Sequence, residues 1–94
     1  MPQHFAVTYS YGPAEEQAKH RPEHRAYLGA LLERGALKVS GPYSDEGSPG
    51  ALLVFEADSP EEVRALLDDD PMVLGGAVTG VEIRSWNPVL GTVG

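Results

Sequence analysis

The feature that most constrains this chain is the order of its periodic segments. Residues 4–10, "HFAVTYS", alternate so that Phe5, Val7 and Tyr9 share one face, as expected for a β-strand. Strand patterns return in "ALKVSGP", "ALLVFEA" and "VEIRSW", and helical patterns separate the first strand from the second and the third from the fourth. The predicted order is therefore strand, helix, strand, strand, helix, strand.

Proline and glycine mark the ends of the predicted helices. Pro22 suits the first position of a helix, where its missing N–H is not needed, and Gly35 ends that helix. The preceding "YGPAEEQAK" is compatible with only a short helical turn. The second helix is expected to begin at Ser59 as the N-cap, with Pro60 in its first position, and Pro71 interrupts it.

Six elements with short connections in 94 residues indicate an α+β, ferredoxin-like βαββαβ fold, in which an antiparallel sheet carries two helices on one face. One domain, residues 1–94, is expected, with a core at about residues 4–88 and a loose C-terminal tail. Leu53 and Phe55 alternate with Leu52 and Val54, so this strand is apolar on both faces. Such strands are usually buried on both faces, and we expect a homodimer packed sheet to sheet.

Composition excludes several classes of partner. The formal net charge of −7 repels phosphate backbones and anionic membrane surfaces, so neither nucleic acid nor a membrane is an expected partner. No apolar run approaches the ~20 residues of a membrane span and no signal peptide is recognisable, so a cytoplasmic location is expected. The absence of cysteine excludes disulfides, thiolate chemistry and Cys-based metal sites. His, Asp, Glu, Ser and Tyr remain for chemistry.

His24 is the first candidate for chemistry. Helical spacing places it on one stripe with Leu28, Leu31 and Leu32, so its ring is predicted to face the core. If the helix begins at Pro22, His24 lies in the first turn, where the positive end of the helix dipole favours a neutral imidazole that accepts a proton. A core-edge histidine bonded to a backbone carbonyl would give the same pattern, so that alternative stays open.

Asp70 is the second candidate. It alone of "DDDP" continues the apolar stripe of the second helix, which consists of Val63, Leu66 and Leu67. Pro71 pushes Asp70 out of helical geometry, so its side chain can turn inward, whereas Asp68 and Asp69 should face water. A solvated charge run is the alternative. In the predicted fold the start of the first helix lies beside the end of the second, which brings His24 toward Asp70, and a carboxylate there would orient the ring.

Other residues are weaker candidates. His20 and His24 have a metal-like spacing, but Pro22 places His20 before the helix, so no metal site is expected. Ser40 could place a hydroxyl near His24 and Arg21 could bind an anionic substrate, although a strand-end serine and a surface arginine need no such role. Tyr9 and Tyr43 are expected in the core or at its rim, and either could line a pocket. Gly75 and Gly76 are expected in a loop, where they could also let a ligand approach the backbone closely.

Four short motifs in this order resemble the YCII (YciI-like) family. They are "RPEH" at 21–24, "SGP" at 40–42, "DDDP" at 68–71 and "GG" at 75–76, and the resemblance runs from about His4 to Pro88. The resemblance implies a dimeric α+β barrel related to muconolactone isomerases, with a site centred on a His/Asp pair that falls on His24 and Asp70. It also places Ser40, Gly41 and Pro42 in a pocket wall. Met72 departs from the aromatic residue that usually follows "DP" in the family, so the pocket and its ligand are expected to differ.

Three functions are compatible with these residues. The leading hypothesis is a cofactor-free isomerase or dehydrochlorinase-like lyase, in which His24, oriented by Asp70, moves a proton on a small cyclic or aromatic substrate such as a lactone or a halogenated phenol. The second is a non-catalytic small-molecule binding or regulatory module that uses the same pocket. The third is a structural dimerisation domain, which predicts no cavity beside His24.

Overall fold

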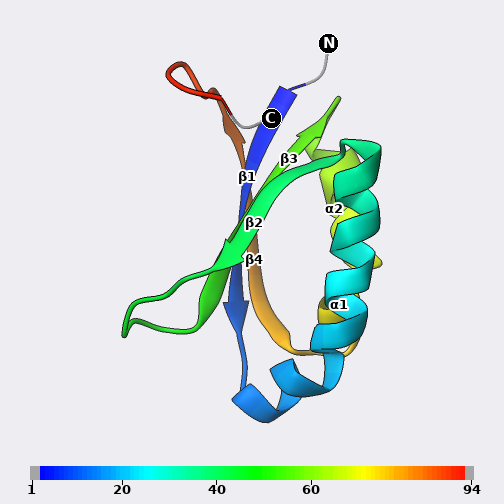
Figure 1. Ribbon diagram of the computed structural model, residues 1–94, viewed down its shortest axis with the longest axis vertical. Helices are drawn as coiled ribbons and strands as arrows, with labels where there is room; N and C mark the ends of the chain where they lie inside the picture. The colour runs from blue at the N-terminus through cyan, green and yellow to red at the C-terminus, as the bar shows by residue number, and fades with distance from the viewer. Residues whose placement is uncertain (1–2, 93–94) are drawn as a thin grey trace.

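The computed structural model describes residues 3–92, and it has the predicted ferredoxin-like order with one additional short helix. The elements are β1 (Gln3–Tyr11), α1 (Ala14–Arg34), β2 (Leu37–Pro42), β3 (Gly50–Ala57), α2 (Pro60–Asp68), α3 (Pro71–Leu74) and β4 (Val78–Trp86). Figure 1 shows α1 and α2 together on one face of the sheet. No helix within residues 3–92 is both long and apolar enough to span a membrane.

The four strands form one antiparallel sheet in the order β2-β3-β1-β4. Val7 of β1 lies opposite Leu53 of β3 and Ile83 of β4, and opposed residues share a face of the sheet. The helix-covered face carries most of the buried side chains of the strands, which are Phe5, Val7, Tyr9, Leu37, Ala51, Leu53, Phe55 and Ala57. Val54 is buried as well, on the opposite face of the sheet. The predicted alternation is therefore confirmed, and it places Tyr9 beneath the helices.

Helix α1 begins earlier than predicted. It runs for 21 residues from Ala14, so Pro22 lies inside the helix and His20 is helical as well. A proline removes one backbone hydrogen bond and crowds the carbonyl four residues earlier, which bends a helix without necessarily ending it. Figure 1 shows α1 bending between its blue first turns and its cyan body. Gly35 ends α1 as predicted, with a left-handed φ of 82° that glycine adopts without strain.

The longer α1 changes one argument about His24. This residue lies in the middle of α1 and not in its first turn. The helix dipole acts mainly within the first and last turns, so the expected influence of the dipole on His24 does not apply. The inward orientation predicted for His24 is nevertheless correct, because the side chain is buried together with Leu28 and Leu31.

The segment after β3 follows the predicted capping pattern. The Ser59 side chain accepts a hydrogen bond from the backbone N–H of Glu62 at 3.2 Å, and Pro60 occupies the first turn of α2. At the other end Asp70 has an extended backbone (φ −67°, ψ 125°) and caps α3, as expected for a residue before proline. Asp68 and Asp69 are exposed and Asp70 is buried, so all three aspartates lie as predicted.

Candidate active site

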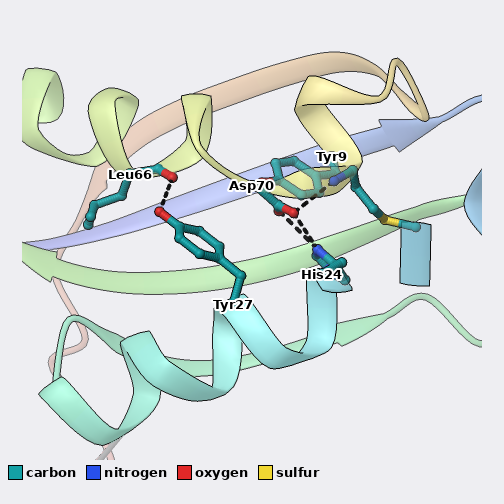
Figure 2. A network of polar contacts seen from close by, with 6 residues as sticks. Tyr9, His24, Tyr27, Leu66 and Asp70 are labelled. Atoms are coloured by element: carbon teal, nitrogen blue, oxygen red, sulfur yellow. Dashed lines mark hydrogen bonds and ion pairs between the residues drawn. The ribbon is translucent and has the colours of Figure 1, made fainter. Parts of the chain in front are cut away.

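His24 and Asp70 meet in the interior between α1 and α3. The Nδ1 atom of His24 lies 2.7 Å from Oδ1 and 2.9 Å from Oδ2 of Asp70, and Figure 2 shows the imidazole pointing at the carboxylate. The exposed fraction is 8% for His24 and 0% for Asp70. The two residues are 46 positions apart in the chain, so this contact exists only in the folded protein.

Three donors surround the Asp70 carboxylate. Besides His24 Nδ1, the hydroxyl of Tyr9 donates to Oδ2 at 2.7 Å and the backbone N–H of Met72 donates to Oδ1 at 3.0 Å. An ionised carboxylate only accepts hydrogen bonds, so the proton of the neutral His24 ring belongs on Nδ1. The buried carboxylate is thereby satisfied, and it selects one tautomer of the histidine.

The second ring nitrogen of His24, Nε2, is not engaged by Asp70. No described residue forms a hydrogen bond with Nε2, and no buried side-chain nitrogen or oxygen within residues 3–92 lacks a partner. Nε2 must therefore reach solvent, and His24 does line a cavity. In the Nδ1–H tautomer Nε2 carries a lone pair, so an accessible proton acceptor lies at the cavity wall.

Tyr9 contacts the Asp70 carboxylate, whereas the sequence predicts a core or rim aromatic that could also line a pocket. Its hydroxyl bond to Asp70 spans 61 positions in the chain. The one indication of this bond in the sequence is the inward position of Tyr9 in the strand pattern, because a buried tyrosine hydroxyl normally has a hydrogen-bond partner. Burial, then the charge of Asp70 and the hydrogen bond to it, raise the pKa of Tyr9 well above its ordinary value of 10.0. Tyr9 therefore remains a protonated donor to Asp70.

A second tyrosine joins α1 to α2 beside the site. The hydroxyl of Tyr27 donates to the carbonyl of Leu66 at 2.6 Å (Figure 2). Leu66 lies in the last turn of α2, where backbone carbonyls lack partners within the helix. This bond helps hold α1, which carries His24, against the segment that leads to Asp70.

The cavity beside His24 has a volume of about 530 Å³ and lies between α1 and the β2–β3 edge of the sheet. The cavity is lined by Ser40, Gly41, Pro42 and Arg21, the four residues expected as weaker substrate-binding candidates. The other weaker candidates, His20, Tyr9, Tyr43, Gly75 and Gly76, do not line it. Leu32 lines it too and is 52% exposed, so its predicted place in the buried stripe is wrong. The reason is that the cavity separates this part of α1 from β2.

A β-bulge places Ser40 on the cavity side of the sheet. Leu37 lies opposite Phe55, but Val39 lies opposite Val54 and Ser40 opposite Leu53, so Lys38 is an extra residue in β2. Without the bulge, alternation from Leu37 would turn Ser40 to the other face. Met72, which departs from the family pattern, is buried against the same cavity.

His20 and Gly75 form a separate contact. A side-chain carbon at position 75 would overlap the imidazole of His20, so the close approach that Gly75 permits is that of a histidine ring. His20 does not line the cavity beside His24. Within residues 3–92, no group of three or more His, Cys, Asp or Glu side chains could hold a metal ion.

The raised pKa of Tyr9 predicts an alkaline loss of stability. The folded state keeps the Tyr9 proton above pH 10.0, where the unfolded state loses it, so the unfolding free energy should fall as pH rises above that value. Below it the contribution is complete. One such group adds a slope of about 1.4 kcal/mol per pH unit. Urea unfolding between about pH 9 and about pH 11 should show a shallower decline in Tyr9→Phe, and parallel curves would contradict the assignment.

Comparison with known proteins gives the family. The YCII-related domain model matches residues 3–87. The protein YciI of Escherichia coli O6:H1 (strain CFT073) is 31% identical over 94 residues, which cover 88% of this chain and 96% of YciI. The uncharacterised protein YjpA of Bacillus subtilis (strain 168) is 35% identical over 68 residues, 72% of this chain and 76% of YjpA.

Solved structures agree on the fold. The 5-chloro-2-hydroxyhydroquinone dehydrochlorinase TftG from Burkholderia phenoliruptrix AC1100, in complex with 2,5-dihydroxybenzoquinone, is 24% identical with a TM-score of 0.76, covering 89% of this chain and 93% of that one. A dimeric ferredoxin-like protein from an uncultured marine organism is 12% identical with a TM-score of 0.53, covering 89% and 84%. At these identities the likeness concerns the fold. The family match and the relatives show that this chain belongs to the YCII-related domain family.

Proposed function

We propose that this protein is a small-molecule enzyme that uses His24 as a general acid/base and needs no cofactor. The observation that carries the proposal is the orientation of the imidazole, whose Nδ1 is bonded to the buried Asp70 carboxylate while Nε2 opens on the cavity. A general base must lie within hydrogen-bonding reach of the substrate proton and must be held in the right tautomer. The bond to Asp70 fixes the tautomer of His24, and a substrate bound in the cavity would lie beside its ring.

The expected chemistry is proton transfer on a small cyclic or aromatic substrate. Nε2 accepts a proton from the substrate, and Asp70 stabilises the imidazolium that results. In an isomerisation the same proton returns to another atom of the substrate. In an elimination the carbon–halogen bond breaks as the proton leaves, and halide is released. The dehydrochlorinase with which the chain shares its fold makes halogenated phenols reasonable first substrates, alongside lactones.

A binding or regulatory module is the second candidate. Asp70 also caps α3 and accepts a hydrogen bond from Tyr9, so a structural role would by itself account for a buried carboxylate at this position. In that case the cavity binds its ligand without changing it. The third reading, a dimerisation domain with a closed interior, is disfavoured by the cavity beside His24.

The test of the proposal is a search for proton exchange. Small phenols, lactones and carboxylic acids are first screened by thermal shift, because a ligand that binds only the native state raises Tm. Each binder is then incubated with the protein in deuterium oxide, and its proton NMR spectrum is followed. The proposal predicts that at least one binder acquires carbon-bound deuterium, isomerises or loses halide at a rate that requires the protein. Binders that all remain chemically unchanged would support the binding module.

We also propose that two copies pack sheet to sheet. The face of the sheet away from the helices exposes Val39, Leu52 and Trp86, at 49%, 41% and 40% of their surface. Val39 and Leu52 lie on the neighbouring strands β2 and β3, and Trp86 lies on β4 at the opposite edge of the sheet. Exposed apolar side chains on one face of a sheet are typical of an interface. The ferredoxin-like protein from an uncultured marine organism, which is described as dimeric, supports the expectation of a dimer.

The dimer predicts a specific effect of one charge. Wild-type protein should sediment at about twice the 10.0 kDa mass of the chain, and Leu52→Glu should sediment as a folded monomer because it buries an unpaired carboxylate in the interface. Leu74→Glu is the matched control, since Leu74 is exposed on α3 and not on the sheet face. A monomeric wild type, or a dimeric Leu52→Glu variant, would contradict this arrangement.

A further inference from the structure

Positive charge is concentrated around the cavity beside His24. Of the seven Lys and Arg residues in the chain, Arg21, Arg25 and Lys38 line it. None of the 14 Asp and Glu residues does. In a chain with a formal net charge of −7, a cavity with only cationic charged groups in its wall departs from the composition of the rest of the protein.

We infer that this cavity selects small organic anions, with a carboxylate held at its rim by Arg25 and Arg21 and an apolar body in contact with its floor. This inference names the substrate class of the site and so rests on the proposed function. It adds that Arg21 and Arg25 determine the preference for an anionic substrate, although proton transfer by His24 does not itself require them.

Exposure separates the rim of the cavity from its floor. Leu28, Leu37, Leu53 and Met72 line the cavity and are buried in the core. Arg21 and Arg25 are exposed, one turn apart on the side of α1 that lines the cavity. A ligand with an apolar ring and one anionic group matches this arrangement, because its ring is desolvated while its charge stays at the edge.

The three cations differ in how far hydrogen bonds and ion pairs within the protein already engage them. No hydrogen bond or ion pair joins Arg25 to another described residue. Among the described residues Arg21 forms one hydrogen bond, and it is long, 3.5 Å from its Nη2 to Oε1 of Gln17. Lys38 Nζ lies 3.6 Å from Oε2 of Glu56, so part of its charge is already balanced. Arg25 is therefore the group most available to a ligand, and a guanidinium can bind a carboxylate through two parallel hydrogen bonds.

The negative charge of Asp70 does not face an anion bound in the cavity. Its oxygens face Tyr9, His24 and the Met72 backbone, it has no exposed surface, and it does not line the cavity. His24 therefore lies between Asp70 and any ligand. When His24 removes a proton from a substrate that carries a carboxylate, the negative charge of the substrate increases. The guanidinium groups of Arg21 and Arg25 at the rim would also stabilise that added charge.

The experiment compares benzoate with its neutral analogue benzamide. Each is titrated into uniformly ¹⁵N-labelled protein, and backbone amide shifts report affinity and location. Benzoate should shift the amides of cavity residues such as Gly29, Ser40 and Gly41 in a saturable way, and benzamide should bind at least about tenfold more weakly. Equal affinities, or no saturable shift by benzoate up to tens of millimolar, would overturn the inference.

Two matched variants identify the cation. Arg25→Gln should weaken benzoate binding about tenfold and leave benzamide binding unchanged, because only the charged contact is lost. Arg64→Gln removes the same charge from α2, outside the cavity, and should change benzoate affinity by less than about twofold. If Arg64→Gln weakens benzoate as much as Arg25→Gln does, the effect is one of net charge and the inference fails.

A third variant tests the location. Gly29 lines the cavity, and a side-chain carbon at this helical position meets no atom within 4 Å. Gly29→Phe should therefore keep the fold but fill the cavity and abolish benzoate binding. Retained benzoate binding in Gly29→Phe would place the anion elsewhere and overturn the inference.

The two proposals fail separately. Selective benzoate binding that depends on Arg25, in a protein that exchanges no proton on any bound compound, would refute the proposed enzyme and support the anion site. Turnover confined to neutral substrates, unaffected by Arg25→Gln, would support the enzyme and refute the anion site.

Discussion

Replacement of His24 by glutamine is expected to lower kcat/KM by about 10²–10⁴-fold on any substrate that the protein turns over. The amide of glutamine can still donate a hydrogen bond to Asp70, but it cannot accept and return a proton at the position of Nε2. The loss should therefore fall on kcat, with KM little changed, because the apolar floor and the cationic rim of the cavity remain.

The control for His24→Gln is a histidine outside the cavity. His20→Gln makes the same chemical change in α1, at a ring that packs against Gly75 and does not line the cavity. Circular dichroism and sedimentation should show that both variants fold and assemble as the wild type does. A folded His24→Gln protein with an unaltered rate would eliminate His24 as the acid/base.

Removal of the Asp70 carboxylate should give the largest loss of stability. Asp70→Ala leaves the hydroxyl of Tyr9, Nδ1 of His24 and the backbone N–H of Met72 without their acceptor in the interior, and it removes the cap of α3. Breaking a buried, hydrogen-bonded charge network costs about 3–5 kcal/mol. In a domain of 94 residues this corresponds to a fall in Tm of at least about 12 °C.

The neighbouring aspartate is a matched control for this variant. Asp69→Ala deletes the same group one position earlier, where the side chain is exposed, and should change the unfolding free energy by no more than about 0.5 kcal/mol. Urea unfolding of both variants measures the difference. An Asp70→Ala protein as stable as Asp69→Ala would mean that Asp70 is solvated in solution, in conflict with its burial.

Much of the fold could be predicted because its signals are local. The alternation of β1, the N-cap Ser59 and the interruption at Pro71 depend on a few neighbouring positions of the chain, and the structure confirms each of them. The predicted start of the first helix at Pro22 is wrong because it, too, is based on a local preference. The preference of Pro22 for the first turn of a helix is a local one, whereas α1 extends through it from Ala14.

The candidate site was predictable in part. Spacing showed that His24 and Asp70 face inward, and their meeting follows from the predicted order of elements. The sequence predicts that the start of the first helix lies beside the end of the second. In the structure it is the middle of α1, where His24 lies, that approaches Asp70. The bond from Tyr9 to Asp70 had no local signal beyond the inward position of a tyrosine in a strand.

The sequence by itself determined which side chains face the interior, because the periods of a strand and a helix depend only on neighbouring residues. Only the tertiary structure decided which of those side chains meet, and where a hollow remains beside them. Tyr9, His24 and Asp70 come from three elements far apart in the chain, and the cavity depends on a bulge at Lys38 and on the distance between α1 and β2. Such relations are set by how whole elements pack against each other, which no short stretch of sequence encodes.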